Sequence, residues 1–221
     1  MLCFVQAVLF CAQVSTPLEV EGQVPPLSFW KSEDFQKCRY ASYLLEGLLA
    51  DAGLPTKAFR AKLFSLVIGT ANAIGEEEEP RKAFSRALKY FHEELGFHAS
   101  HQKPTLKTVL PSSVIKNRCG TKLMLTVLFL ALMDRQVLPG ETKARFPLRP
   151  FLVPGSLLLR YEFDTYHLTL VPAEGNVILS DSQLAERWPR RGPDTKLGSV
   201  FRELKLPELA GLLLAELAQA Y

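Results

Sequence analysis

Residues 117–133 read NRCGTKLMLTVLFLALM, a polar turn with one glycine followed by a run that is apolar on nearly every side. A helix that is apolar all round is stable only where other elements cover all of its faces. The pattern therefore predicts a central buried helix that begins at about Thr121 and fades at residues 134–136. Cys119 stands just before this helix, where the helix dipole and unpaired backbone N–H groups favour a thiolate.

The composition is that of a globular protein and excludes several functional classes. With 221 residues, 48% hydrophobic and 22% charged, the chain can bury a sizeable core. The net charge of +3 is small, and Lys and Arg are interspersed with acidic residues, so the basic stripe of a nucleic-acid-binding protein is missing. The cysteines and histidines show no zinc-ligand spacing. We therefore expect no nucleic-acid partner, no metal and no cofactor.

The N-terminal half divides into three predicted segments. Residues 1–14 carry an apolar run of the length of a signal-peptide core, with a buried N-terminal helix as the alternative. This run is short for a bilayer-spanning helix, so we expect no stable transmembrane span in the mature chain, and an exported or periplasmic location is slightly favoured over the cytoplasm. Residues 15–28 are rich in Pro, Glu and Gly and are typical of a linker. Residues 29–97 have helical spacing and predict a helical subdomain that ends with helices at 56–74 and 80–95.

Residues 98–188 are predicted to form an α+β core in which the central buried helix packs against an antiparallel sheet. Four prolines from Pro139 to Pro154 exclude a helix there, and the segments 157–163, 166–171 and 177–180 are predicted to be strands. In the middle strand, His167 and Thr169 share the face opposite Leu168. The remaining expected elements are a short helix at 184–188, a loop at 189–206 and an amphipathic C-terminal helix at 207–221, which either docks on the domain or is a repeat remnant.

Four segments occur in a recognisable order: FHEELGF at 91–97, VIKNRCG at 114–120, LP at 138–139 after the apolar helix, and VPGSLLLRY at 153–161. In this order they resemble the SirB-type transglutaminase-like proteins of bacteria, over about residues 56–185. The resemblance implies a papain/transglutaminase-like core with a Cys–His–Asp triad, and often a C-terminal tetratricopeptide-repeat tail.

The sequence departs from this family at two catalytic positions. The family places its nucleophile two residues after the glycine, where this chain has Lys122, and the histidine of its PGH motif is replaced by Ser156. The resemblance therefore implies a pseudoenzyme that binds protein partners or acts as a scaffold, through a cleft lined by Arg118, Lys122 and Ser156 or through the C-terminal helix. The alternative is a divergent cysteine hydrolase or acyltransferase that uses Cys119, His167 and Asp181.

Overall fold

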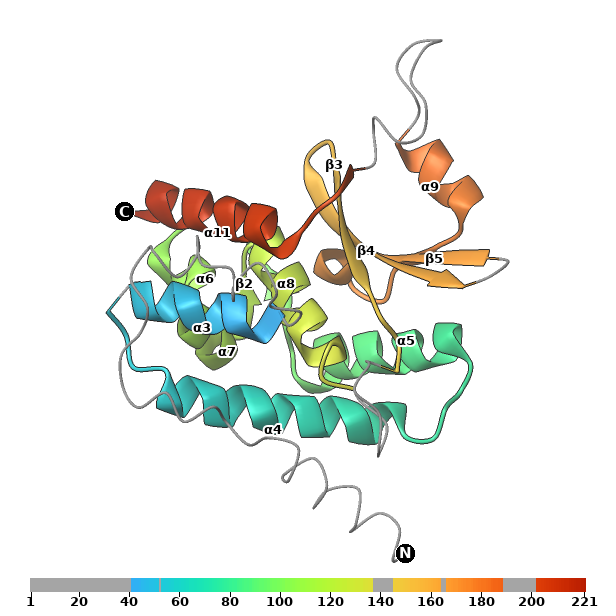
Figure 1. Ribbon diagram of the computed structural model, residues 1–221, viewed down its shortest axis with the longest axis horizontal. Coiled ribbons are helices and arrows are strands. Elements are labelled where there is room, and N and C mark those ends of the chain that lie inside the picture. Colours follow the sequence, from blue (N-terminus) through green and yellow to red (C-terminus); the bar gives the residue numbers. More distant parts are fainter. Residues whose placement is uncertain (1–40, 52, 137–144, 164–165, 189–201) are drawn as a thin grey trace, which may run out of the picture.

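The computed structural model describes residues 41–51, 53–136, 145–163, 166–188 and 202–221 (Figure 1). The candidate signal peptide at 1–14, the linker at 15–28, the Leu138-Pro139 pair and most of the loop at 189–206 lie outside these residues. The predicted α+β fold, with a central buried helix against an antiparallel sheet, is confirmed. Among the described helices, none is long and apolar enough to cross a membrane.

Three helices come first in the described part of the chain. They are α3 (Ala41–Asp51), α4 (Lys57–Ile74) and α5 (Pro80–Lys89). The expected single helix over 80–95 instead ends in a π-helical turn, η2 (Tyr90–Glu94), marked by the hydrogen bond from Leu95 N–H to the carbonyl of Tyr90 at 2.9 Å. Tyr90 crosses α4 at Gly69, where an added Cβ would lie 2.0 Å from its hydroxyl oxygen.

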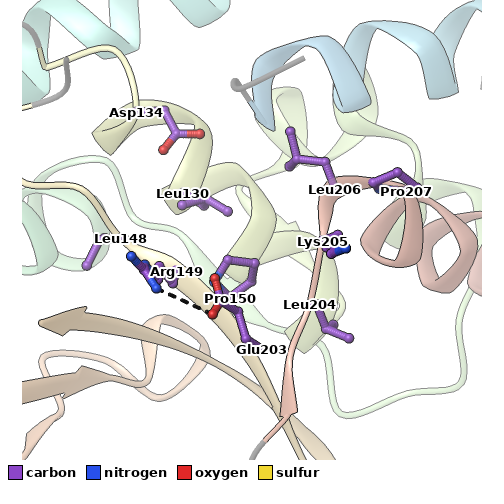
Figure 2. Close-up of a pocket in the computed structure, with 10 residues that line it drawn as sticks. All are labelled: Leu130, Asp134, Leu148, Arg149, Pro150, Glu203, Leu204, Lys205, Leu206 and Pro207. Carbon is purple, nitrogen blue, oxygen red and sulfur yellow. Dashed lines mark hydrogen bonds and ion pairs between the residues drawn. The ribbon is translucent and has the colours of Figure 1, made fainter. Parts of the chain in front are cut away.

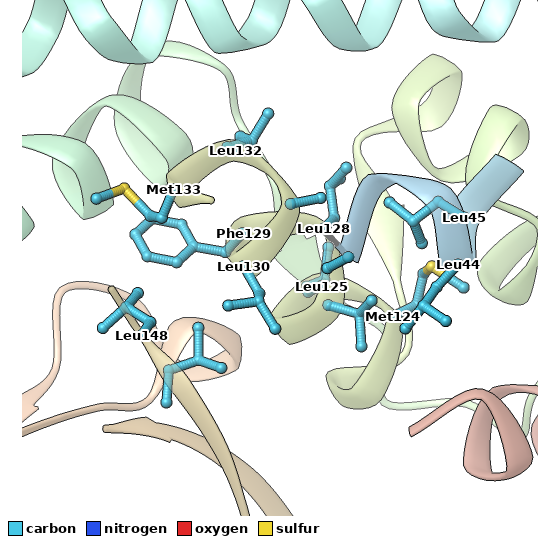
Figure 3. Close-up of a cluster of buried hydrophobic side chains, with 14 of the residues drawn as sticks. Leu44, Leu45, Met124, Leu125, Leu128, Phe129, Leu130, Leu132, Met133 and Leu148 are labelled. Carbon is cyan, nitrogen blue, oxygen red and sulfur yellow. The ribbon is translucent and has the colours of Figure 1, made fainter. Parts of the chain in front are cut away.

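Two short helices and a small parallel ladder lead into the central helix. They are α6 (Leu106–Val109), α7 (Pro111–Asn117), β1 (His98–Ala99) and β2 (Cys119–Gly120). The central helix, α8 (Lys122–Met133), is capped by Thr121, whose hydroxyl accepts the N–H of Met124 at 3.1 Å. Every residue from Met124 to Met133 is buried, and Figure 3 shows the side chains of Leu128, Leu130 and Met133 pointing to different sides of the helix.

The larger sheet is antiparallel with strand order β6-β5-β4-β3-β7. Its strands are β3 (Arg149–Val153), β4 (Ser156–Phe163), β5 (Tyr166–Leu170), β6 (Ile178–Leu179) and β7 (Arg202–Glu203). A 3-10 turn, η3 (Pro172–Glu174), and the helix α9 (Asp181–Arg187) connect the later strands, and α11 (Leu206–Ala220) ends the chain.

Two strands of the larger sheet are absent from the sequence prediction. Prolines obscured β3, and β7 lies within the expected loop 189–206. The carbonyl of Pro150 accepts the N–H of Leu204 at 2.9 Å, which shows that the polar backbone groups of Pro150 face away from β4. In a strand the nitrogen and carbonyl of one residue point to the same side, so the missing N–H of Pro150 faces β7 and the ladder with β4 loses no bond.

The two faces of the sheet bury different side chains. One face joins the main core around α8 through Leu157, Leu159, Tyr161, Leu168 and Leu170. The other face forms a smaller cluster with α9 through Val153, Leu158, Val171 and Leu184. The sheet therefore separates an inner, α8-facing side from an outer, α9-facing side.

The C-terminal helix α11 is part of the fold. Leu209, Leu213 and Leu217 are buried in the main core, and α11 packs against α3 and α6 (Figure 1). Glu216 Oε2 accepts a hydrogen bond from the Thr121 hydroxyl at 2.7 Å, which connects α11 to the residue that caps α8. Burial raises the pKa of Glu216 above its usual range, against the hydrogen bond from Thr121.

A second carboxyl connects the other end of α8 to α3. Asp134 follows the last residue of α8, and its Oδ2 accepts the backbone N–H of Ala41 at 2.9 Å. Burial raises the pKa of Asp134 to about 7, although the hydrogen bond from Ala41 and the charge of Arg135 both act to lower it. Desolvation is therefore the larger effect at this carboxyl.

Truncating α11 in the core is expected to destabilise the whole domain. Leu213 is 1% exposed, so Leu213→Ala should lower the free energy of unfolding by about 2–4 kcal/mol, through lost burial and the cavity left behind. Gln219→Ala, at an exposed position of the same helix, should change it by less than about 0.5 kcal/mol. Chemical denaturation of both variants measures this, and equal unfolding free energies would mean that α11 does not support the core.

Asp134 should make stability depend on pH. Its folded pKa of about 7 lies above the unfolded value of roughly 3.9, so the folded state binds the proton more tightly and stability falls as pH rises from about 4 to about 7, by up to about 4 kcal/mol. Asp134→Asn keeps an oxygen for the N–H of Ala41 and removes the titration. Urea unfolding at about pH 5 and about pH 8 should therefore show the variant gaining stability relative to the native chain at the higher pH. Parallel pH profiles would contradict the assignment.

Candidate functional site

The turn into α8 is held by residues on both sides of it. Arg118 caps α7 in the left-handed conformation, with φ of 59°, and its carbonyl accepts the N–H of His98 at 3.0 Å. Cys119 is a free thiol in β2, half-buried and paired with His98 across the ladder. At Gly120 an added Cβ would lie 2.9 Å from a Val114 methyl carbon, so only glycine fits between α7 and α8. This packing fixes the position of the residues that follow.

Lys122 is the first residue of α8, and its exposed side chain reaches toward the sheet. Its Nζ lies 3.9 Å from Glu174 Oε1 on η3, and Glu174 also pairs with Arg187 of α9. We call Lys122, Glu174 and Arg187 the entrance cluster. This contact places the Lys122 ammonium beside a carboxylate at the start of α8.

The other two predicted binding residues lie on separate elements. The Arg118 guanidinium stacks over the Phe97 ring, with its carbon 4.8 Å from the ring centroid, and its Nη1 is buried without a hydrogen-bond partner among the described residues. Ser156 begins β4 after the Pro154–Gly155 turn and is half-buried opposite Val153.

His167 and Asp181 meet on the outer side of the sheet. His167 Nδ1 lies 2.9 Å from Asp181 Oδ2, and Arg160 Nη2 forms an ion pair with Asp181 Oδ1 at 3.1 Å. We call Arg160, His167 and Asp181 the sheet-face cluster. Ion pairs continue it across the sheet, from Arg160 to Glu162 at 3.7 Å, from Glu162 to Arg149 at 3.5 Å and from Arg149 to Glu203 at 3.4 Å.

The structure brings His167 and Asp181 of the predicted triad together on the outer side of the sheet. Leu168 and Leu170 face α8, so the alternation of β5 directs His167 to the opposite face. His167 is also four residues, about 13 Å of extended strand, from Val171, beyond which η3 reaches the start of α8. No hydrogen bond joins Cys119 to His167 in the described part of the chain.

Some of these charged contacts could have been predicted from the sequence. Arg160 and Glu162 lie on the same face of a predicted strand, because side chains alternate along a strand. Glu162 pairs with His167 on the neighbouring strand, so His167 lies on that face too. Arg149 and Glu203 lie on β3 and β7, which were not predicted. No group of three or more His, Cys, Asp or Glu side chains suited to a metal ion occurs among the residues that the structure describes.

A cleft of about 330 Å³ lies beside the C-terminal half of α8, away from its start (Figure 2). Leu130 of α8 and Asp134, which follows α8, line one side, the beginning of β3 a second, and the segment that joins β7 to α11 a third. This cleft was not predicted, because the residues that line it come from three separate segments, 130–134, 148–150 and 203–207.

Comparison with known proteins agrees with this fold. A family model described as the transglutaminase-like superfamily matches residues 57–203, from α4 to β7. A UPF0162 protein of Buchnera aphidicola subspecies Schizaphis graminum is 29% identical over 136 residues, which is 61% of this chain and 47% of the relative, so the chain spans about half the length of that protein. No solved structure matches the chain. Because the family match covers well over half of the residues and includes the buried helix and most of the sheet, the chain belongs to the transglutaminase-like superfamily.

Proposed function

We propose that this chain is a SirB-type member of the superfamily that has lost its catalytic pair and works as a protein-binding or scaffold module. The observation that carries the proposal is Lys122 at the first position of α8, in a salt bridge with Glu174. The family resemblance places the nucleophile at this position, and Ser156 stands where the resemblance places the histidine.

Thiol catalysis needs a thiolate, a base within hydrogen-bond reach and a group that orients the base. Lys122 supplies no thiol, and the hydroxyl of Ser156 is not a base at neutral pH. Cys119 lies in β2, three residues before the first helical position, and its neighbour across the ladder is His98. A displacement of even about 1 Å can lower a rate roughly a hundredfold, so a thiol on the preceding strand is a poor replacement.

The partner surface in this proposal is the entrance cluster with its surroundings. Lys122 and Arg187 are exposed cations held by one carboxylate, and α11 supports the start of α8 through Glu216. Exposed charges in fixed positions give an interface orientation and partner choice. Because SirB-type proteins often carry tetratricopeptide repeats, we include an association of this domain with such repeats in the proposal.

The second candidate is a cysteine hydrolase or acyltransferase. It is favoured by the His167–Asp181 hydrogen bond of 2.9 Å, which is the orienting contact of a catalytic dyad. It requires Cys119 to reach His167 from the other side of the sheet, which the arrangement of β5 opposes.

The two candidates differ in their response to single substitutions. We expect the chain to hydrolyse p-nitrophenyl acetate no faster than its Cys119→Ser variant does. We also expect it to attach no fluorescent alkylamine to the glutamine side chains of a test protein. The enzyme candidate predicts that Cys119→Ser and His167→Ala each lower the rate about a hundredfold or more, since general-base catalysis contributes about that factor. His101→Ala, an exposed histidine outside both clusters, is the control.

The position of the family nucleophile can be tested directly. In Lys122→Cys the introduced thiol stands at the start of a long helix, where a pKa lowered by about one unit raises the thiolate fraction about tenfold. Iodoacetamide labelling followed by peptide mass spectrometry should show it reacting about tenfold faster than Cys119 in the same chain. The matched control is Asn117→Cys at the C-terminal end of α7, where the helix dipole disfavours a thiolate. Equal rates at 117 and 122 would remove the basis for placing the nucleophile at 122.

A further inference from the structure

We propose that the cleft between α8, β3 and the start of α11 is a binding site for an alkylammonium group, with an apolar stem on leucine side chains and the ammonium hydrogen-bonded to Asp134. This site is separate from the entrance cluster and contains none of Arg160, His167 and Asp181, although Arg149 and Glu203 at its rim belong to the ion pairs that extend from them. It does not depend on the function proposed above, because it lies beside the opposite end of α8.

The shape and lining of the cleft suit a small ligand. Its volume of about 330 Å³ lies at the lower end of the range for small-molecule pockets. Leu130, Leu148 and Leu206 contribute apolar surface from three different segments (Figure 2). A short hydrocarbon stem placed among them leaves water, which is favourable in proportion to the apolar area that it buries.

Asp134 supplies the polar anchor. Its Oδ2 already accepts the N–H of Ala41, and a carboxylate has further lone pairs on both oxygens. Burial at this carboxyl outweighs both the hydrogen bond from Ala41 and the attraction of Arg135, so the ionised form is only partly compensated. A ligand cation in the cleft provides that compensation through a charge-assisted hydrogen bond.

The charges at the cleft favour a cation over an anion. Arg149, the first residue of β3, already forms ion pairs with Glu203 at 3.4 Å and with Glu162 at 3.5 Å. Lys205 is exposed at the rim and can keep its ammonium in water. The charge that a bound ligand meets away from solvent is therefore the carboxylate of Asp134.

Titration of the ¹⁵N-labelled full chain with n-pentylamine and with n-pentanol tests the proposal by backbone amide shifts. The amine should bind about tenfold more tightly than the alcohol, because only the amine makes the charge-assisted bond, and its shifts should map to residues 130–134, 148–150 and 204–207. Nα-acetyl-lysine methylamide distinguishes the source of the group: tighter binding than pentylamine indicates a lysine side chain of a protein, and weaker binding indicates a free amine. Failure of both amines to bind overturns the proposal.

Two variants with matched chemistry separate Asp134 from general electrostatics. Asp134→Asn keeps an acceptor for Ala41 and should reduce amine binding to the level of the alcohol. Glu94→Gln removes an exposed carboxylate outside the cleft and should leave the amine affinity within about threefold, because solvent and salt screen a distant surface charge. Equal affinities for amine and alcohol in the native chain, or equal losses in the two variants, would overturn the site. The comparison within the native chain needs no variant and stands even if one of them fails to fold.

Discussion

The complete burial of α8 is the constraint on which the rest of the structure depends. A helix without a polar face needs cover on every side, and α8 receives it from α3 and α4 before it in the chain and from β4 and η3 after it. The buried hydroxyl of Thr126 is satisfied within the helix, by donation to the carbonyl of Lys122 at 2.9 Å. The helices α3 and α4 on one side and the sheet on the other therefore form one core around α8. Neither side buries its apolar residues without α8.

Two carboxyl groups, one at each end of α8, connect it to the first described helix and to the last. Glu216 reaches Thr121 from α11, and Asp134 reaches the backbone of Ala41. In both carboxyls burial raises the pKa, so each contact carries a desolvation cost that the surrounding apolar packing must offset. Helices that are far apart in the sequence are thereby joined to the same element. This makes α11 a support of the α8 start, and any function at that start depends on a helix near the C-terminal end of the chain.

The central helix, the fold class and the three strands near β4, β5 and β6 could be predicted because each depends on local periodicity, which survives in a single sequence. The prediction failed where tertiary contacts override local signals. β3 exists because β4 and β7 flank it, in spite of Pro150, and the π-helical turn at Tyr90 lies where that residue crosses α4 at Gly69. Lys122 could be identified because its position is two residues after Gly120 in the sequence. Its partner Glu174 and the role of Asp134 in the cleft could not be predicted, because both depend on tertiary contacts.

His167 shows how strand alternation and the needs of the core determine which face of the sheet a polar residue occupies. The order Cys119, His167, Asp181 suits a triad, and the last two do form a hydrogen bond of 2.9 Å. Strand alternation, however, permits only one face per residue, and β5 gives its inner face to Leu168 and Leu170 because the core around α8 needs them. A shift of one residue in register would turn His167 toward α8, but it would also expose both leucines, at a cost of about 1.5–3 kcal/mol each. The burial of α8 thus determines the side of the sheet on which His167 lies, and Asp181 and Arg160 hold it there.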